Sequence, residues 1–254
     1  MKSALNIKRY IPSIISAIIF LLFWELFVGY FKISEWLLPA PSRIIMAIYR
    51  SRVLLLQHSV RTIIEAVSGL ILASIAGTII GGSLFHFPLL KKVFYPYLLI
   101  SQTVPIVVLI PLLVIWLGYG VLPKLIIVIL ACFFPIAVNT VDGLFAADLE
   151  MLNLLRSMGA TDWQVFKMVR IPVALPMIFS GLRIGATYAV MAAVVAEWMG
   201  SDMGLGVFIL RSSNSYLTAQ VFAGIVLISI YSIVFFQLVN YLEKIFVPWS
   251  NKIT

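Results

Sequence analysis

Apolar residues occur along this chain in long runs, each about as long as a bilayer is thick. A helix needs about 20 consecutive apolar residues to cross the hydrocarbon core, and helical runs of that length are separated here by short polar segments. The sequence therefore predicts an all-α, polytopic membrane protein with six transmembrane helices. We expect these helices at residues 12–31, 62–84, 94–117, 121–143, 172–198 and 219–243.

Composition agrees with the pattern and excludes an ordinary soluble domain. Hydrophobic residues make up 62% of the chain and charged residues 11%, whereas soluble domains have about 45–50% and about 25%. A net charge of +8 could indicate nucleic-acid binding, but the basic residues stand singly or in pairs between apolar runs. We expect the lipid bilayer as a partner and no nucleic acid.

The two ends of the chain are expected on the same side of the membrane. Lys2, Lys8 and Arg9 precede an apolar run that is too long for a signal-peptide core and lacks a cleavage site, so the first helix is retained. Connections on the side of the termini carry more Lys and Arg than those on the other side, although Arg43, Arg50 and Arg52 weaken the bias. The excess predicts cytoplasmic N- and C-termini.

The chain divides into three parts. Residues 1–54 hold the first helix and an external amphipathic segment, 55–245 the main transmembrane domain, and 246–254 a cytoplasmic tail. In the external segment Ser42 could cap a short helix lying on the membrane surface, or the segment could be a solvated connector.

A polar, amphipathic island at residues 155–172 separates two apolar runs. Gly159 predicts a turn between two short helices, and Ile171 with Pro172 predicts where the second of them stops. Apolar anchors within a polar rim suit docking to a soluble partner; a loop lying on lipid headgroups is the alternative. The anchors are Met151, Leu154, Leu155, Met158, Trp163, Val165 and Phe166.

Polar residues and prolines within the expected spans are candidates for a pathway. Carbonyls freed by proline must face protein or water, so the third and fourth spans are expected to line it, although kinked spans can also line nothing. Glu197, at the outer end of the fifth span, could be a gate group or a structural partner. The candidates are Gln102, Thr103, Pro105, Pro111, Pro135, Asn139, Asp142, Glu197, Gly204 and Gly206.

Other charged residues within the spans need partners. Arg61 and Glu65 lie four positions apart, so they can pair on one helix face. Arg183 could extend to the cytoplasmic interface. The sequence does not determine which residue pairs with Glu25.

Catalytic and cofactor-binding patterns are absent from the sequence. Cys132 is the lone cysteine, and His58 and His86 lie at opposite ends of the second span, which predicts neither a nucleophile with its base nor a metal cluster. The chain also lacks a Gly-rich loop ending in Gly-Lys-Ser/Thr, so it is not an ATPase. We expect no enzymatic activity, cofactor or metal.

The island resembles the cytoplasmic loop of permease subunits from bacterial binding-protein-dependent ABC importers. That loop has a glycine, nine residues and then aliphatic-x-aliphatic-Pro, which Gly159, Val169, Ile171 and Pro172 match. One departure is Asn153-Leu154-Leu155, where the family has an acidic residue and two alanines. The resemblance covers residues 55–245 and implies docking to the ATPase through Leu155, Met158, Gly159, Ala160, Trp163, Phe166, Ile171 and Pro172.

The same resemblance implies a homodimer of permeases in the bacterial plasma membrane, two copies of an ABC ATP-binding subunit and an external solute-binding protein. A membrane anchor or assembly factor without transport activity is the alternative. Several blocks, such as Gln102-Thr103-Val104-Pro105, are similar to the branch for nitrate, sulfonates, taurine and pyrimidine precursors of thiamine. Asp202-Met203-Gly204-Leu205-Gly206 favours pyrimidine-precursor or riboflavin-like members, but no residue identifies the solute.

Overall fold

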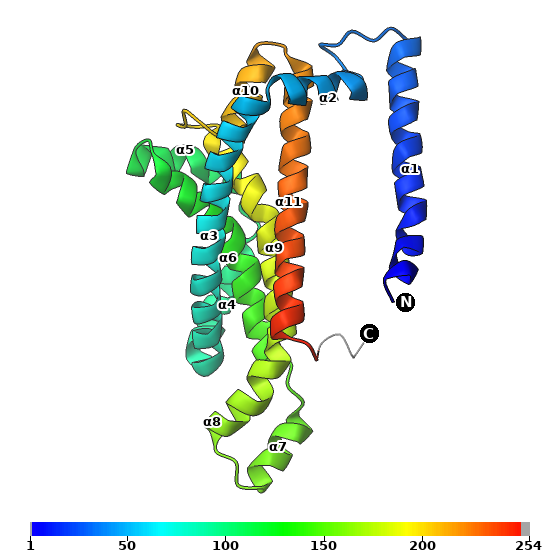
Figure 1. Ribbon diagram of the computed structural model, residues 1–254. Helices are drawn as coiled ribbons and strands as arrows, with labels where there is room; N and C mark the ends of the chain where they lie inside the picture. Colours follow the sequence, from blue (N-terminus) through cyan, green and yellow to red (C-terminus); the bar gives the residue numbers. More distant parts are fainter. Residues whose placement is uncertain (1, 250–254) are drawn as a thin grey trace.

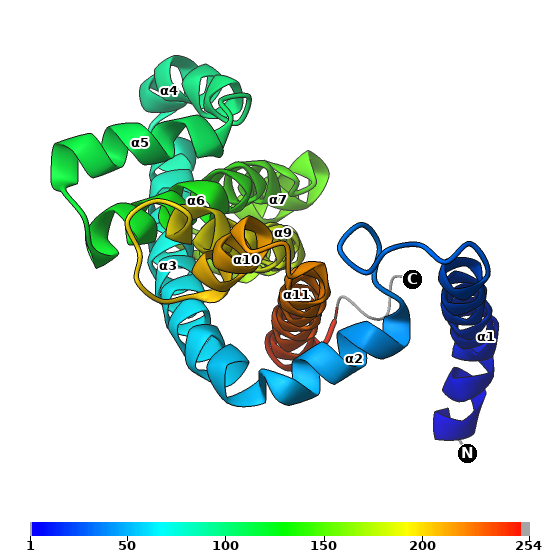
Figure 2. The same ribbon diagram turned by 90° about the horizontal axis from the view of Figure 1, so that it is seen from above.

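The computed structural model describes residues 2–249, with the backbone alone described for residues 2–10. Within this part the chain is helical and contains no strand. The long helices run roughly alongside one another, with α1 to one side of the others in Figure 1 and Figure 2. They are α1 (Lys2–Tyr30), α3 (Arg52–His86), α6 (Val121–Phe145), α9 (Ile171–Glu197) and α11 (Thr218–Phe246).

Shorter helices lie at the ends and along one flank of this bundle. The helices α2 (Pro41–Arg50) and α10 (Leu205–Asn214) lie at one end, and α7 (Leu149–Ser157) and α8 (Asp162–Val165) project from the other (Figure 1). The helices α4 (Pro88–Ser101) and α5 (Ile106–Leu117) cover a flank. The short π-helix η1 (Phe166–Arg170) joins α8 to α9.

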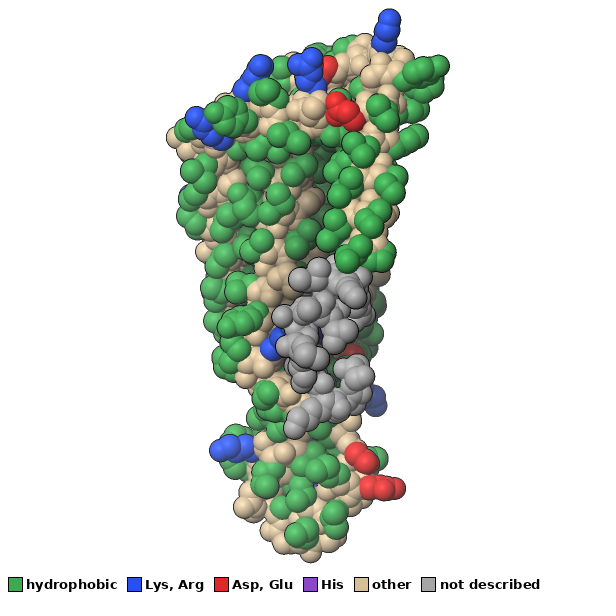
Figure 3. All heavy atoms as spheres, turned by 45° about the vertical axis from the view of Figure 1, so that its right-hand side comes forward, with side chains coloured by type: hydrophobic (Ala, Val, Ile, Leu, Met, Phe, Trp, Pro, Cys, Tyr) green, Lys and Arg blue, Asp and Glu red, His purple; other side chains and the backbone are tan. Residues whose placement is uncertain are grey.

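Five helices of the described chain are long and apolar enough to cross a membrane, or six if α4 and α5 count as one broken span. Figure 3 shows an apolar flank with charged side chains gathered near both ends. The predicted class, an all-α polytopic membrane protein, is confirmed. The long helices lie near the expected spans. One start differs: α3 begins at Arg52, well before the expected residue 62.

Small residues let the central helix α6 approach its two neighbours closely. A Cβ on Gly81 of α3 would lie 2.7 Å from Cβ of Thr140, and one on Gly181 of α9 would lie 2.8 Å from the carbonyl oxygen of Pro135. Small residues at such contacts are how membrane helices pack without a hydrophobic driving force between them. The core therefore lies between α3, α6 and α9.

The span expected at 94–117, with Pro105 among the residues that interrupt it, consists of two helices with a sharp bend between them. The helices α4 and α5 meet at an angle of 101°. Pro105 cannot donate a backbone hydrogen bond and pushes Val104 out of the helical region. Thr103 closes the resulting turn, because its hydroxyl and its N–H both donate to the carbonyl of Ile100, at 2.7 and 3.0 Å.

The helix that the sequence ends at Ile171-Pro172 continues instead. Residues 162–197 form one helical run, which bulges into a π-turn at Phe166–Arg170. The N–H of Ile171 donates to the carbonyl of Phe166, five residues back. Such a bulge absorbs the missing donor of Pro172 without breaking the helix. The projecting segment is thus a continuation of α9.

The external segment also differs in detail. A short helix, α2, is present, but its N-cap is Ala40 and no side chain caps it. Ser42 instead donates from its hydroxyl and its N–H to the carboxylate of Glu25, at 2.7 and 3.0 Å. These two bonds hold α1 to α2. Residues 250–254 of the expected tail lie outside the described residues.

Candidate functional site

The projecting part of the molecule consists of α7, the turn after it, α8 and η1, and we call it the knob (residues 147–170). It lies beyond the bundle at the end where α11 finishes (Figure 1). The indole of Trp249 donates a 3.2 Å hydrogen bond to the carbonyl of Pro172, so the last described residues lie beside the base of the knob. A small core of Ala147, Leu152, Val165 and Val169 holds it together.

The turn of the knob is fixed by backbone hydrogen bonds. The N–H of Gly159 donates to the carbonyl of Arg156, and the N–H of Ala160 to the carbonyl of Leu155, both at 3.0 Å. Gly159 has φ of +86°, which only glycine adopts at little cost. This is the Schellman motif that commonly ends helices. The turn that the sequence predicted at Gly159 is therefore present.

The second half of the knob starts from an equally defined cap. Thr161 and Gln164 form a capping box, in which the Gln164 N–H donates to the Thr161 hydroxyl and the Thr161 N–H donates to the Gln164 side chain. Arg156 and Asp162 pair across the turn at 3.0 Å. Two caps and an exposed ion pair thus define the turn of the knob.

The predicted anchor residues of the knob do not all face outward. Met151, Leu154, Met158 and Trp163 are exposed, Trp163 by 67%. Val165 is buried and Leu155 and Ala160 pack against the small core. Phe166 is half-buried between Trp163 and Phe85, with ring centres 5.8 and 5.9 Å away. Phe166 thus connects the knob to the C-terminal end of α3.

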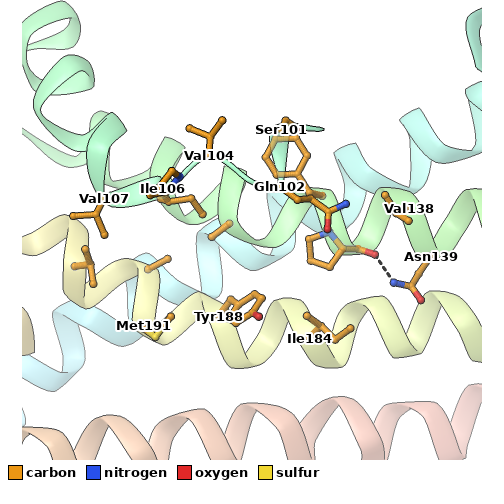
Figure 4. A pocket seen from close by; sticks show the side chains of 16 residues that line it. Ser101, Gln102, Val104, Ile106, Val107, Val138, Asn139, Ile184, Tyr188 and Met191 are labelled. Atoms are coloured by element: carbon orange, nitrogen blue, oxygen red, sulfur yellow. Dashed lines mark hydrogen bonds between the residues drawn. The ribbon is translucent and has the colours of Figure 1, made fainter. Parts of the chain in front are cut away.

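A cavity of about 620 Å³ lies between the α4–α5 break, α6 and α9. Of the predicted pathway residues, four line it: Gln102, Pro105, Pro135 and Asn139. Figure 4 shows Gln102, Asn139 and Tyr188 around the same hollow, with Asn139 donating a 2.8 Å hydrogen bond to the Pro135 carbonyl. Asp142 does not line it and accepts a hydrogen bond from the Tyr95 hydroxyl at 2.7 Å. Thr103 lies in the turn beside it.

A third group of polar residues lies buried at the opposite end of the bundle from the knob. The consecutive N–H groups of Gly204, Leu205 and Gly206 donate to His58 Nδ1, Thr62 Oγ1 and Glu197 Oε2, at 2.9, 2.8 and 2.7 Å. We call these six residues the outer cluster. It joins α3, the end of α9 and the start of α10.

Charged residues next to the outer cluster are paired. The expected Arg61–Glu65 pair is confirmed at 2.9 Å, and Lys124 of α6 forms a second, buried ion pair with the same carboxylate. Lys124 also donates to the hydroxyl of Ser201 at 3.1 Å. Elsewhere, Arg183 pairs with Glu243 of α11 rather than extending freely to the interface.

Glu197, Gly204 and Gly206 are therefore placed together but away from the cavity. Sequence reasoning missed His58 and Thr62, although their signal was available: His58, Thr62 and Glu65 recur at four- and three-residue spacing on one face of an apolar span. It also missed Tyr188, Phe134 and Met191 of the cavity, which resemble ordinary span residues.

The chain is similar to a family of transport proteins and to individual transport permeases. A family model described as "binding-protein-dependent transport system inner membrane component" matches residues 69–250. The formylaminopyrimidine transport permease protein ThiX of Halalkalibacterium halodurans is 36% identical, with 86% of this chain and 88% of that protein covered.

Two further relatives and one solved structure are also similar to this chain. The riboflavin transport system permease protein RibX of Chloroflexus aurantiacus is 30% identical over 93% of this chain and 89% of that protein. The putative aliphatic sulfonates transport permease protein SsuC of Bacillus subtilis is 30% identical, over 96% and 90%. A crystal structure of an amino acid ABC transporter is similar in fold, with a TM-score of 0.64 at 16% identity, over 78% of this chain and 97% of that chain.

Proposed function

We infer that this chain, which belongs to the family of binding-protein-dependent transport system inner membrane components, is the translocating subunit of an ATP-driven importer. As a member it is a multi-pass membrane permease of an ABC transporter for small solutes. The finer proposal is that an external binding protein delivers the solute and that ATP hydrolysis by two copies of a soluble subunit drives its passage. The knob carries this proposal.

The knob has the features that docking to an ATPase requires. Exposed Met158 and Trp163 surround a turn that two caps hold rigid. Its second half continues into α9 as one helical run, so a displacement of the knob would tilt α9 directly. Large apolar side chains within a polar rim are typical of the residues that dominate binding energy.

We propose the following orientation and assembly. The knob, the end of α11 and the basic N-terminus face the cytoplasm, and the outer cluster faces the binding protein. Two copies of the permease pair, because each chain has one knob and a pair of ATPase subunits needs two. We keep the proposed division of the chain. Residues 1–54 form the added helix and the external segment, residues 55–245 form the permease domain, and residues 246–254 form the tail.

The solute group is proposed from the relatives. The three relatives are named for formylaminopyrimidine, riboflavin and aliphatic sulfonates. The taurine transport system permease protein TauC of Escherichia coli is also 30% identical, over 78% of this chain and 72% of that protein. These compounds fall into two chemical classes, uncharged heteroaromatic compounds and sulfonates. We propose that the solute of this transporter comes from one of the two.

Reconstitution tests the proposed function. The permease is co-expressed with the ATPase and binding protein encoded beside it and placed in liposomes. We expect solute uptake that needs ATP on the knob side and the binding protein on the other side. A permease that neither co-purifies with an ATPase nor supports uptake would be the anchor or assembly factor considered as the alternative.

A further inference from the structure

The cavity between the α4–α5 break, α6 and α9 has an uncharged lining, which bears on the class of solute that it can bind. Among the described residues that line it, none carries a charged side chain. A desolvated ion needs a partner of opposite charge, whereas an uncharged polar group needs only hydrogen bonds. The lining therefore disfavours a sulfonate or another permanent anion.

Charged residues on the adjoining helices do not compensate for this lack. Asp142, one turn from Asn139 on α6, is bound to the Tyr95 hydroxyl. Arg183 of α9 is paired with Glu243 of α11. The positive charge nearest along α9 is thus already neutralised by a carboxylate of the protein.

The helix break contributes hydrogen-bond donors. The C-terminal end of α4, at Ser101, and the N-terminal end of α5, at Ile106, both border the cavity. The carbonyls of Ile100 and Ser101 already accept hydrogen bonds from Thr103 and Val104 within the turn. The first N–H groups of α5 have no partner within the helix, so the break offers donors without a charged side chain.

Side chains add a matching set. The amide of Asn139 uses its NH₂ group for the Pro135 carbonyl, which leaves its oxygen as an acceptor without a hydrogen-bond donor among the described residues. Gln102 and Tyr188 contribute an amide and a hydroxyl from the break and from α9 (Figure 4). The remaining surface includes the ring of Phe134 and the side chain of Met191, which suit a flat aromatic face.

We propose that this cavity binds an uncharged, planar nitrogen heterocycle through a donor–acceptor edge, as an aminopyrimidine would present. The inference rests on the proposed transport function and assigns its solute class. Gln102, Asn139 and Tyr188 form hydrogen bonds with the edge of the ring. The apolar lining excludes the hydration shell that an anion would keep.

A protection experiment on the full chain in lipid nanodiscs tests the proposal. Val138, which lines the cavity, is replaced by cysteine in a Cys132→Ser background, and its labelling by a maleimide is followed with 4-amino-5-hydroxymethyl-2-methylpyrimidine or with taurine present. Ala219→Cys is the control, because it lies in a separate hollow that contains Glu35, Arg43 and Arg50. We expect the pyrimidine, and not taurine, to slow labelling at position 138 only.

Two lining variants make the result specific. Tyr188→Phe removes a single hydroxyl and Asn139→Leu removes the amide, and each should raise the pyrimidine concentration needed for protection about fivefold, as expected for one hydrogen bond. Protection by taurine alone, or by neither compound, would overturn the proposal. ATP-driven uptake by the assembled transporter is measured in parallel: its absence counts against the proposed function, and its presence without protection counts against the heterocycle site alone.

Discussion

The hydroxyl of Thr62 donates a 2.6 Å hydrogen bond to the carboxylate of Glu197, which lies 135 residues away in the sequence. The same hydroxyl oxygen accepts from the N–H of Leu205 at 2.8 Å. Both side chains are almost fully buried, with Glu197 only 1% exposed. One side chain of α3 therefore joins the end of α9 to the start of α10.

Replacing Thr62 by valine should loosen this junction. The shape is kept, but Glu197 and the Leu205 N–H each lose a buried partner, so we expect a loss of about 1–3 kcal/mol in unfolding free energy. Thermal unfolding in detergent measures it. Thr187→Val is the matched control, because the Thr187 hydroxyl is exposed and bonds only within its own helix. Equal shifts for the two variants would contradict the assigned role of Thr62.

The segment that follows Glu197 is expected to move during transport. Met203 is 45% exposed and Leu205 is fully buried. In a Cys132→Ser background, Met203→Cys should react with an impermeant thiol reagent in the resting state, and Leu205→Cys should react only when ATP is trapped in the complex. Identical labelling of Leu205→Cys in both states would remove the proposed gate from this segment, leaving Glu197 a structural residue.

Gly159 should tolerate no other residue even though space is available. A Cβ at this position would meet nothing within 4 Å, so the penalty is conformational, about 1–2 kcal/mol for an L-residue at positive φ. We expect Gly159→Val or Gly159→Pro to abolish uptake while membrane insertion stays normal. Gly82→Ala is the control, since its surroundings are equally open but its backbone is helical. Normal uptake by Gly159→Val would show that the turn does not transmit motion.

Trp163 and Phe166 should differ when truncated to alanine. The exposed indole of Trp163 is free to enter a pocket on the ATPase, so Trp163→Ala should weaken co-purification by about 2 kcal/mol or more and leave the permease stable. Phe166→Ala should also weaken it, and should in addition lower the thermal stability of the permease because the ring stacks on Phe85. Undiminished co-purification of Trp163→Ala would argue against docking at this face.

The buried pair of Lys124 and Glu65 should be far more sensitive than the exposed pair of Arg156 and Asp162. Lys124→Met leaves a carboxylate that is 2% exposed with Arg61 as its remaining partner, and breaking such pairs costs about 3–5 kcal/mol. Arg156→Met should cost less than about 1 kcal/mol. Thermal unfolding of the two variants tests the contrast, and similar midpoints would mean that Arg61 alone suffices for Glu65.

Hydropathy and local turn chemistry predicted much of this molecule. Apolar runs located the long helices, and Gly159 with its flanking residues located the knob, because span length and helix capping depend on residues a few positions apart. The same local reasoning expected an interruption at Pro105, which is present, and a helix end at Pro172, which is not. Both prolines remove a donor, yet one produces a sharp bend and the other a π-bulge inside a continuous helix.

What the sequence alone determined is the all-α membrane class, the position of the helices and the presence of a capped turn at Gly159. Only the tertiary structure decided that Thr62 meets Glu197, that Phe166 stacks on Phe85, and that Gln102 and Asn139 share a cavity with Tyr188. These contacts join helices that are distant along the chain. They depend on how closely glycine faces let α3 and α9 approach α6, which no periodicity within a single helix reports.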